Sequence, residues 1–212
     1  MKKTFVIFSL AIFAAILSFK TGWFNYVLII MTVLSIATLL LVGLLSIFKN
    51  LNNRAHKVPI YIILICVIGI ITSLFRPYNK AIIKSENIEA NLKYAYETDQ
   101  SDRKELRSYV KFISKLDERD SLRLSQVKDI YSENKITDPL NQFHAAFIFH
   151  HSNNSADYKI ASGLASQAAR SKVLESNLTA QWLKKAAYDR FMLSIGKQEK
   201  YKTQNKFSFE IK

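Results

Sequence analysis

Residues 137–204 read TDPLNQFHAAFIFHHSNNSADYKIASGLASQAARSKVLESNLTAQWLKKAAYDRFMLSIGKQEKYKTQ, and this stretch decides the fold of the second part of the chain. Asp138 followed by Pro139 is typical of a helix start, because the aspartate caps free backbone N–H groups and proline is favoured at the first helical position. The apolar pattern ends near His151, and the polar run 152–155 predicts a turn. Gly196 predicts the end of a later helix. We therefore expect helices over about 138–151, 156–173 and 178–195.

The preceding segment carries further helical patterns. Apolar spacing predicts a helix over about 84–97. Asp102 and Glu105 have the spacing of a capping box, so a second helix is expected to start at Asp102, with a buried stripe made by Leu106, Tyr109, Val110, Ile113 and Leu116. Helical spacing continues to about Ser132, and only the tail 207–211 shows strand signals. The predicted fold class for residues 79–212 is an all-α domain of antiparallel helix pairs.

The first third of the chain has the composition of a membrane segment. No Asp or Glu precedes Glu86. Three apolar runs occupy residues 4–19, 24–48 and 59–75, and a helix needs roughly 20 residues to cross the hydrocarbon core. We therefore expect residues 1–78 to form an anchor of three transmembrane helices, with the first two paired as an antiparallel hairpin. A cleaved signal peptide is the alternative for residues 4–19, but no suitable cleavage site follows them.

Basic residues flanking the three runs predict the orientation of the anchor. Five lie on the side of the N-terminus and four on the other side, which favours a cytoplasmic N-terminus and a soluble domain outside the cytoplasm; they are Lys2, Lys3, Lys49, Arg54 and Lys57 against Lys20, Arg76, Lys80 and Lys84. The runs contain no charged side chain or histidine, whereas transporters and proton relays usually have such groups within the membrane. An anchor in the bacterial cytoplasmic (inner) membrane is thus favoured over a transporter.

Composition also argues against several classes of partner. The formal net charge is +13, but Lys and Arg alternate with acids and form no dense run, so we expect no nucleic-acid partner. Cys66 is the only cysteine, which excludes an intrachain disulfide and a cysteine-based metal site. No motif predicts a metal or another cofactor.

Four short motifs in the soluble part resemble a known family. They are Asp120-Ser-Leu-Arg123, Ala145-Ala-Phe-Ile-Phe-His-His151, Ala187-Tyr-Asp-Arg190 and Gly196-Lys-Gln-Glu-Lys-Tyr-Lys-Thr-Gln204. Together they resemble the DUF6624 family of uncharacterised bacterial proteins over about residues 100–207. In that family an apolar run ends in Gln-His and the closing motif contains Y-G-T-Q, whereas this chain has His150 and Lys202. If the family's glycine needs a positive φ, Lys202 is expected to be strained. The resemblance implies that these positions belong together as a group and that the domain is exported. It implies no chemical activity.

The polar residues of these motifs are the candidate site. They are Asp120, Arg123, His151, Asp189, Arg190, Gln198, Tyr201, Thr203 and Gln204. Asp189 and Arg190 lie in an apolar helix, and burying either without a partner would be costly, so we expect each to find a partner from another segment. Two interpretations stay open: a structural network that fixes how the helices meet, or a ligand site. His151 is correspondingly either a structural histidine or an acid–base group.

These observations predict a membrane-anchored bacterial protein whose helical domain binds a protein or small-molecule partner, in envelope sensing or toxin immunity. The alternative is a membrane-bound enzyme that uses His151, Asp189 and Arg190, although no nucleophile–base set can be assembled from the sequence. A third alternative is an oligomeric pore or defence effector assembled through the spans, with a polar rim formed by Thr32, Ser35 and Thr38. The expected partners are thus the lipid bilayer and a protein.

Overall fold

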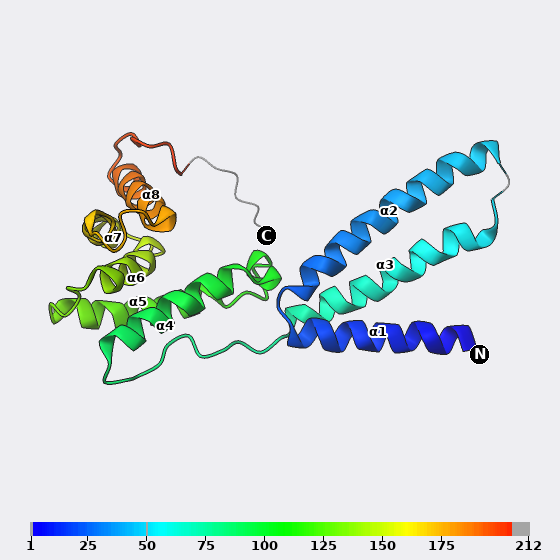
Figure 1. Ribbon diagram of the computed structural model, residues 1–212, viewed down its shortest axis with the longest axis horizontal. Helices are drawn as coiled ribbons and strands as arrows, with labels where there is room; N and C mark the ends of the chain where they lie inside the picture. The colour runs from blue at the N-terminus through cyan, green and yellow to red at the C-terminus, as the bar shows by residue number, and fades with distance from the viewer. Residues whose placement is uncertain (1, 50, 205–212) are drawn as a thin grey trace. The chain divides into compact units, whose positions relative to one another are not determined.

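A computed structural model describes residues 2–49 and 51–204, and the elements found there are all helical. The chain divides into two compact units, Met1–Pro77 and Tyr78–Lys212. Figure 1 shows the order of the helices within each unit: α1 (Lys2–Lys20), α2 (Phe24–Phe48) and α3 (Asn53–Leu74), then α4 (Ile88–Arg103), the 3-10 helix η1 (Leu106–Tyr109), α5 (Leu116–Ser132), α6 (Pro139–His150), α7 (Ser155–Arg170) and α8 (Leu178–Ser194). The all-α prediction is confirmed for these residues.

In the first unit, α3 is the central helix. It packs along both α1 and α2, whereas α1 and α2 diverge after the short link between them (Figure 1). The expected hairpin contact between the first two helices is therefore wrong. The physical reason is Gly69 of α3: a Cβ placed there would lie 2.5 Å from Cδ1 of Leu28 and 3.4 Å from the carbonyl oxygen of Ala14. A larger residue at position 69 would require the Leu28 side chain to move, so glycine favours this close approach.

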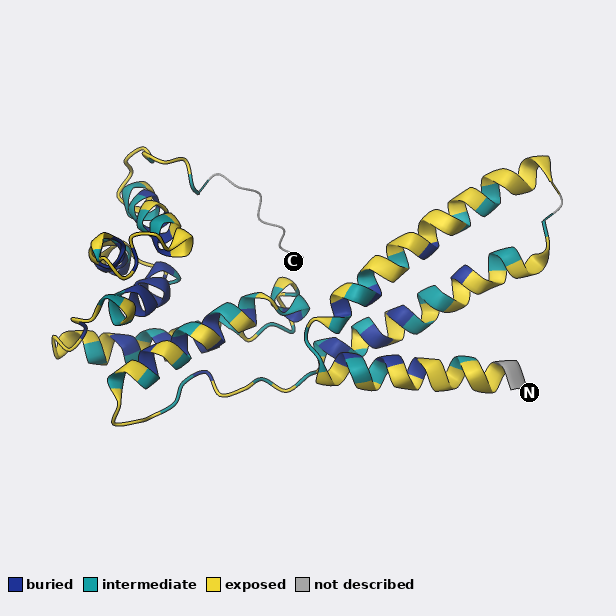
Figure 2. Cartoon of the chain, viewed as in Figure 1, coloured by how far each residue is buried: buried dark blue, intermediate teal, exposed yellow. Residues whose placement is uncertain are grey.

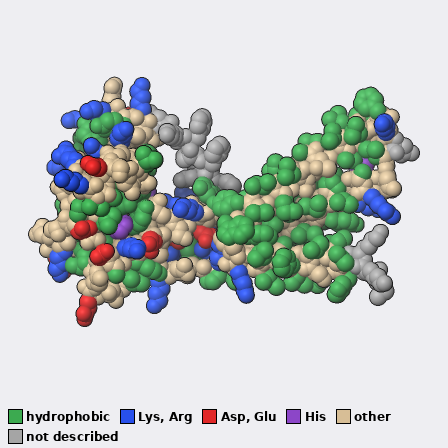
Figure 3. Space-filling view, in the orientation of Figure 1, with side chains coloured by type: hydrophobic (Ala, Val, Ile, Leu, Met, Phe, Trp, Pro, Cys, Tyr) green, Lys and Arg blue, Asp and Glu red, His purple; other side chains and the backbone are tan. Residues whose placement is uncertain are grey.

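Two helices of the first unit, α2 and α3, are long and apolar enough to cross a membrane. The apolar part of α1, Thr4–Lys20, is shorter, so the structure supports two candidate spans where three were expected. α3 begins six residues before the expected span, because the side chain of Asn52 accepts a hydrogen bond from the backbone N–H of Arg54 and starts the helix there. Apolar side chains cover the visible surface of these helices (Figure 3).

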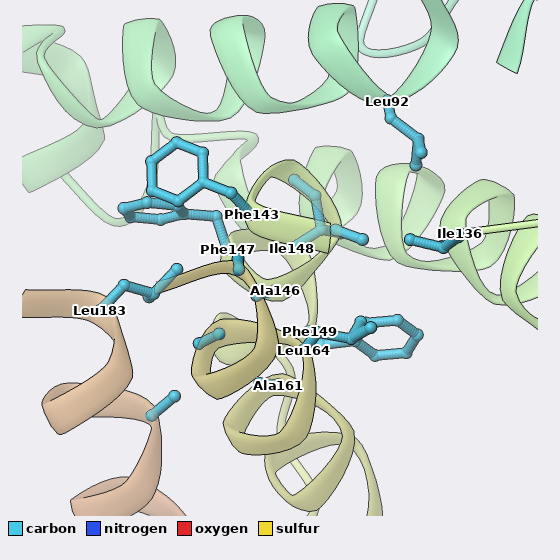
Figure 4. Packing of buried hydrophobic residues seen from close by; sticks show 14 of the residues in the cluster. Leu92, Ile136, Phe143, Ala146, Phe147, Ile148, Phe149, Ala161, Leu164 and Leu183 are labelled. Carbon is cyan, nitrogen blue, oxygen red and sulfur yellow. The ribbon is translucent and has the colours of Figure 1, made fainter. Parts of the chain in front are cut away.

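The core of the second unit is built around α6. Every residue from Phe143 to His150 is buried, and Figure 2 shows most of this helix in dark blue. Its side chains point in several directions, toward α4, α5, α7 and α8 (Figure 4). Alanines of α7 and α8 allow close contact with it, among them Ala161, Ala165 and Ala187. The sequence predicts α6 well because Asp138 caps it as expected, accepting from the N–H groups of Leu140 and Asn141.

One predicted helix start is wrong. Asp102 does not begin a helix but lies in the last turn of α4, and its side chain is 7% exposed. The chain then forms η1 and a loop before α5, so the expected stripe is not buried: Tyr109 is 47% exposed. The capping-box spacing predicted a helix start here, but the Asp102 carboxylate binds arginines of α5 instead of backbone N–H groups.

Smaller differences concern the turns. α7 is capped by Asn154, whose side chain accepts from the N–H of Asp157. Gly196 has a φ of +73° directly after the last residues of α8, as a glycine that ends a helix should. The strand signal at 207–211 lies outside the described residues.

Candidate functional site

Seven charged or ionisable side chains of the second unit gather where α4, α5 and the end of α6 meet. We call this group the arginine–carboxylate cluster; its members are Asp99, Asp102, Arg103, Arg119, Asp120, Arg123 and His151. The positions 99, 102 and 103 share one face of α4, and 119, 120 and 123 share one face of α5, because residues three or four apart are neighbours on a helix. Three carboxylates face three guanidinium groups, so their formal charges cancel.

Arg123 is the centre of the cluster and is fully buried. Its Nη1 donates to Oδ1 of Asp120 at 2.9 Å and its Nε donates to Oγ1 of Thr98 at 3.2 Å, while its Nη2 donates to Asp102. A buried guanidinium is tolerated only when its donors are satisfied in this way.

Arg119 completes the inner part of the cluster. Its Nε and Nη2 donate to the two oxygens of Asp102 at 2.6 and 3.1 Å, a two-bond arrangement that fixes the relative position of the groups. Its Nη1 donates to the backbone oxygen of Asn79 at 2.6 Å. The inner cluster therefore ties α4 and α5 to the segment that enters the second unit.

The outer part of the cluster contains His151, the residue that ends α6. Its Nδ1 lies 3.1 Å from Oδ1 of Asp99 and 3.1 Å from Nε of Arg103. One ring nitrogen cannot donate to the first and accept from the second, and a carboxylate is the stronger partner, so we assign the proton to Nδ1 and the hydrogen bond to Asp99. Nη2 of Arg103 donates to Oδ2 of Asp120 at 2.6 Å.

The surroundings separate the pKa values of the outer groups. Burial raises the pKa of Asp99, but the hydrogen bond and charge of His151 and the charge of Arg103 outweigh it, so that pKa lies well below its usual range. Burial raises the pKa of Asp120 above its usual value, and the charge of Arg103 offsets only part of this. Burial also lowers the pKa of His151 in spite of its bond to Asp99. The ring is thus mainly neutral at neutral pH, with Nε2 unprotonated and hydrogen-bonded to no described residue.

A second group, which we call the C-terminal cluster, is formed by Asp189, Arg190, Thr203 and Gln204. Asp189 is fully buried, and its carboxylate accepts from the backbone N–H groups of Lys200, Tyr201 and Thr203 and from the Thr203 hydroxyl, at 2.8 to 3.1 Å. Burial raises the pKa of Asp189, but these hydrogen bonds more than offset the effect and the pKa lies below its usual value. Asp189 therefore holds the chain that follows α8.

Arg190 connects the two clusters. Its Nε donates to Oε1 of Gln204 at 3.0 Å and its Nη1 donates to the backbone oxygen of His150 at 2.6 Å, one residue from His151. It makes no ion pair with Asp189, as expected for neighbours about 100° apart on a helix. The turn that brings Gln204 back to α8 requires a φ of +56° at Lys202, so the strain expected at this position is real.

The candidate residues thus fall into two adjacent groups. The structure places Asp120, Arg123 and His151 in the first, and Asp189, Arg190, Thr203 and Gln204 in the second. Tyr201 contributes its backbone N–H while its side chain is 38% exposed, and Gln198 is exposed with no hydrogen bond among the described residues. Sequence reasoning missed Asp99, Asp102, Arg103 and Arg119. Their only signal is charge at helical spacing, which a solvent-exposed helix face shows as well.

The arrangement allows some kinds of chemistry and not others. In the described ranges, no group of His, Cys, Asp and Glu is arranged to hold a metal ion, because arginines already bind the clustered carboxylates. Among the described residues, no serine, threonine or cysteine hydrogen-bonds to His151, whose partners are Asp99 and Arg103. The Nε2 edge of His151 can accept a hydrogen bond, and Arg103 can donate one.

Comparisons with protein-family models, with curated proteins and with solved structures find no match to this chain. The resemblance to the DUF6624 family therefore rests on the four motifs quoted above.

Proposed function

We propose that this chain is a membrane-anchored bacterial protein of the DUF6624 type whose helical domain binds a protein or small-molecule partner at the outer part of the arginine–carboxylate cluster. One observation carries the proposal: exposure within the cluster is graded. The side chains of Arg123 and Asp99 are 0% and 1% exposed, whereas Arg103, Asp120 and His151 keep 28%, 17% and 16%. We call these last three residues the open edge. The inner residues hold the fold, and the open edge still has hydrogen-bonding capacity.

An exposed aromatic side chain near the open edge supports a binding role. Trp182 of α8 is 45% exposed, and its ring lies 6.3 Å from those of Phe147 and His150. The same two rings are the neighbours of His151, at 6.3 and 5.4 Å. Tryptophan and arginine are the residue types that most often dominate binding energies at interfaces. A partner that covers Trp182 and hydrogen-bonds to Arg103 and His151 would fit this edge.

Anchoring in the bacterial inner membrane is the second part of the proposal. α2 and α3 supply two candidate spans, and α1, packed along α3, is proposed as the third. The outward apolar side chains support a lipid environment: Phe8, Leu40 and Ile47 are 65%, 66% and 73% exposed, and water would make such a surface unfavourable. Three spans and the bias of basic residues would place the helical domain outside the cytoplasm, where envelope sensing or toxin immunity are the roles that fit.

An enzyme is the second candidate, favoured by one specific observation. Asp99 bound to Nδ1 of His151 is the pairing that orients a general base, and Nε2, which bonds to no described residue, is the atom that would take the proton. Carboxyl groups whose pKa values are driven apart also occur at acid–base sites. Asp189 and Arg190, however, are occupied with the C-terminal segment, which leaves His151 without the helpers that the sequence suggested.

A pore is less well supported. The hydroxyls of Thr32 and Thr38 donate to carbonyl oxygens of their own helix, at Leu28 and Leu34, and Ser35 is buried within the unit. A hydroxyl that donates within its own helix can still accept a hydrogen bond from elsewhere, so these three groups give no specific support to a polar lining.

The binding proposal is tested by photo-crosslinking in cells that produce the full chain. A benzophenone amino acid replaces Trp182, and the matched control carries it at Leu122, which is 46% exposed on α5. The proposal expects a discrete adduct from position 182 that is absent from position 122 and is lost when His151→Ala is added. The yields are compared at a temperature at which circular dichroism shows that the variant is still folded, since the substitution removes a partner of buried Asp99. The same yield with and without His151→Ala, or no adduct at all, would contradict it. Product formation from a substrate panel that disappears in His151→Ala would favour the enzyme.

A further inference from the structure

The loop that joins η1 to α5 exposes aromatic and basic side chains together. We call residues 109–115 the aromatic loop. Phe112 at its tip is 83% exposed and Tyr109 is 47% exposed, while Lys111 and Lys115 are exposed beside them. An aromatic side chain this exposed leaves its apolar surface in water and would gain free energy if that surface were buried.

The backbone of the aromatic loop is held in a defined turn. The N–H groups of Ile113 and Ser114 both donate to the carbonyl oxygen of Val110, at 3.0 and 2.9 Å. At the start of the segment, the Ser108 hydroxyl donates to the backbone of Asp102, which fixes the segment to α4. These hydrogen bonds fix the backbone of the loop. The folded loop itself therefore exposes Phe112.

The aromatic loop is also fixed to the residue at which the second unit begins. The guanidinium of Arg107 lies 3.3 Å from the ring centre of Tyr78, and the N–H of Lys115 donates to the Tyr78 hydroxyl at 3.3 Å. Tyr78 follows the end of α3 at Leu74 by four residues. Four residues span at most about 14 Å. The ring that holds the loop is thus close to the end of a candidate membrane span, however the two units are arranged.

From this tether and this chemistry we infer that the aromatic loop inserts into the headgroup region of the same bilayer that holds α2 and α3, with Phe112 as the inserted side chain. Aromatic residues are favoured at that depth, and lysines beside them are attracted to anionic lipid headgroups. Lys104 adds a third exposed base, against the acids Glu105, Asp117 and Glu118, so insertion of Phe112 and not net charge is the main contribution. The inference rests on the proposed membrane anchoring.

The test uses the full chain in vesicles of phosphatidylcholine, with or without phosphatidylglycerol. Cys66, which is buried, is replaced by alanine, and single cysteines carrying an environment-sensitive fluorophore are placed by Phe112→Cys, Leu40→Cys and Leu178→Cys. Leu40 of α2 reports on membrane insertion. Leu178, 86% exposed at the start of α8, is the matched control for an apolar residue left in water. Quenching by bromolipids and by aqueous iodide is then compared.

We expect the Phe112→Cys label to show blue-shifted emission, quenching by shallow bromolipids and loss of iodide quenching relative to the Leu178→Cys label. Lys111→Glu should restore part of the iodide quenching in phosphatidylglycerol vesicles only. If the Leu40→Cys label is quenched by lipid but the Phe112→Cys label behaves as the Leu178→Cys label does, this inference is wrong and the anchor stands. If the Leu40→Cys label is not quenched by lipid either, both proposals fail. A label at 112 shielded from iodide yet not quenched by lipid would show a protein contact and overturn the inference.

Discussion

Arg123 shows at the scale of one residue why most of the charged cluster is structural. It is fully buried between α4 and α5 and donates to Asp102, Asp120 and Thr98. Replacing it with an apolar side chain leaves two carboxylates short of a partner. Removing one member of a buried ion pair costs about 3–5 kcal/mol.

We therefore predict that Arg123→Met lowers the free energy of unfolding of the second unit by about 3–5 kcal/mol. The matched control is Lys93→Met on the outer face of α4, where the Lys93–Glu97 pair is more than half exposed and should contribute little. Urea titrations followed by circular dichroism measure both. Equal effects of the two substitutions would show that the cluster does not hold the helices together.

Lys202 is a second residue whose conformation makes a prediction. Its φ of +56° is unfavourable for any side chain with a Cβ, and the DUF6624 pattern that this motif resembles has glycine at this position. Lys202→Gly should raise the free energy of unfolding by about 1 kcal/mol, because it removes this strain. Lys200→Gly, whose φ is not positive, should instead be neutral or slightly destabilising. A loss of stability in Lys202→Gly would mean that the side chain makes a contact that outweighs the strain.

His150 makes stability depend on pH. Burial, together with the charges of Arg190 and His151, lowers its pKa to about 2. The unfolded chain, with a pKa of about 6.5, therefore binds a proton that the folded domain rejects. The stability conferred by neutral His150 is full above about pH 6.5 and is lost as the pH falls from there toward 2, by about 1.4 kcal/mol per pH unit.

His150→Gln should remove this contribution, since glutamine does not titrate and the backbone oxygen that binds Arg190 remains. The slope of unfolding free energy between about pH 6 and 5 should decrease by about 1.4 kcal/mol per unit. His144 and His151, whose pKa values burial also lowers, should keep a smaller slope of the same sign. Parallel curves for the two proteins would be inconsistent with a neutral buried His150.

At the scale of elements, the close approach of α3 to α1 and α2 depends on Gly69. We predict that Gly69→Leu separates these helices and costs about 1–3 kcal/mol, as overpacking usually does. Gly43→Leu on α2 is the control, because a Cβ there meets nothing within 4 Å. Thermal melting in detergent compares them, and an unchanged melting temperature for Gly69→Leu would show that the packing is not close.

The elements also show how far the sequence alone could lead. The bounds of α6 and α8 were predicted almost to the residue, because Asp138, Pro139 and Gly196 act locally through capping and backbone conformation. The start expected at Asp102 was wrong for the opposite reason. Its spacing to Glu105 is that of a cap, but its carboxylate binds Arg119 and Arg123, which lie 17 and 21 positions away.

The same distinction applies to the candidate site. Asp120, Arg123 and His151 could be singled out from motifs, whereas the only local signal of Asp99 and Arg103 is charge at helical spacing. Charged residues at helical spacing predict a helix face equally well when it is exposed and when it is paired with another helix. Only the packing of α4 against α5 and α6 decides between the two, and no local pattern encodes that packing.

At the scale of the whole molecule, we propose that the first unit holds the protein in a membrane and that the second unit folds on its own core. The first unit ends at Pro77, so Tyr78 belongs to the second unit. The guanidinium groups of Arg107 and Arg119, which lie over the Tyr78 ring, belong to the same unit. The second unit has a continuous core of buried residues from α4 to α8. Its helices therefore need nothing from the first unit for their hydrophobic stabilisation.

Membrane extraction at alkaline pH, with and without residues 1–77, tests this account most directly. We expect the full chain to stay in the membrane pellet after carbonate treatment, and residues 78–212 to be soluble, with a helical circular dichroism spectrum and cooperative melting. Release of the full chain by carbonate, or a shortened chain that does not fold, would contradict the division into a membrane anchor and an independent helical binding domain.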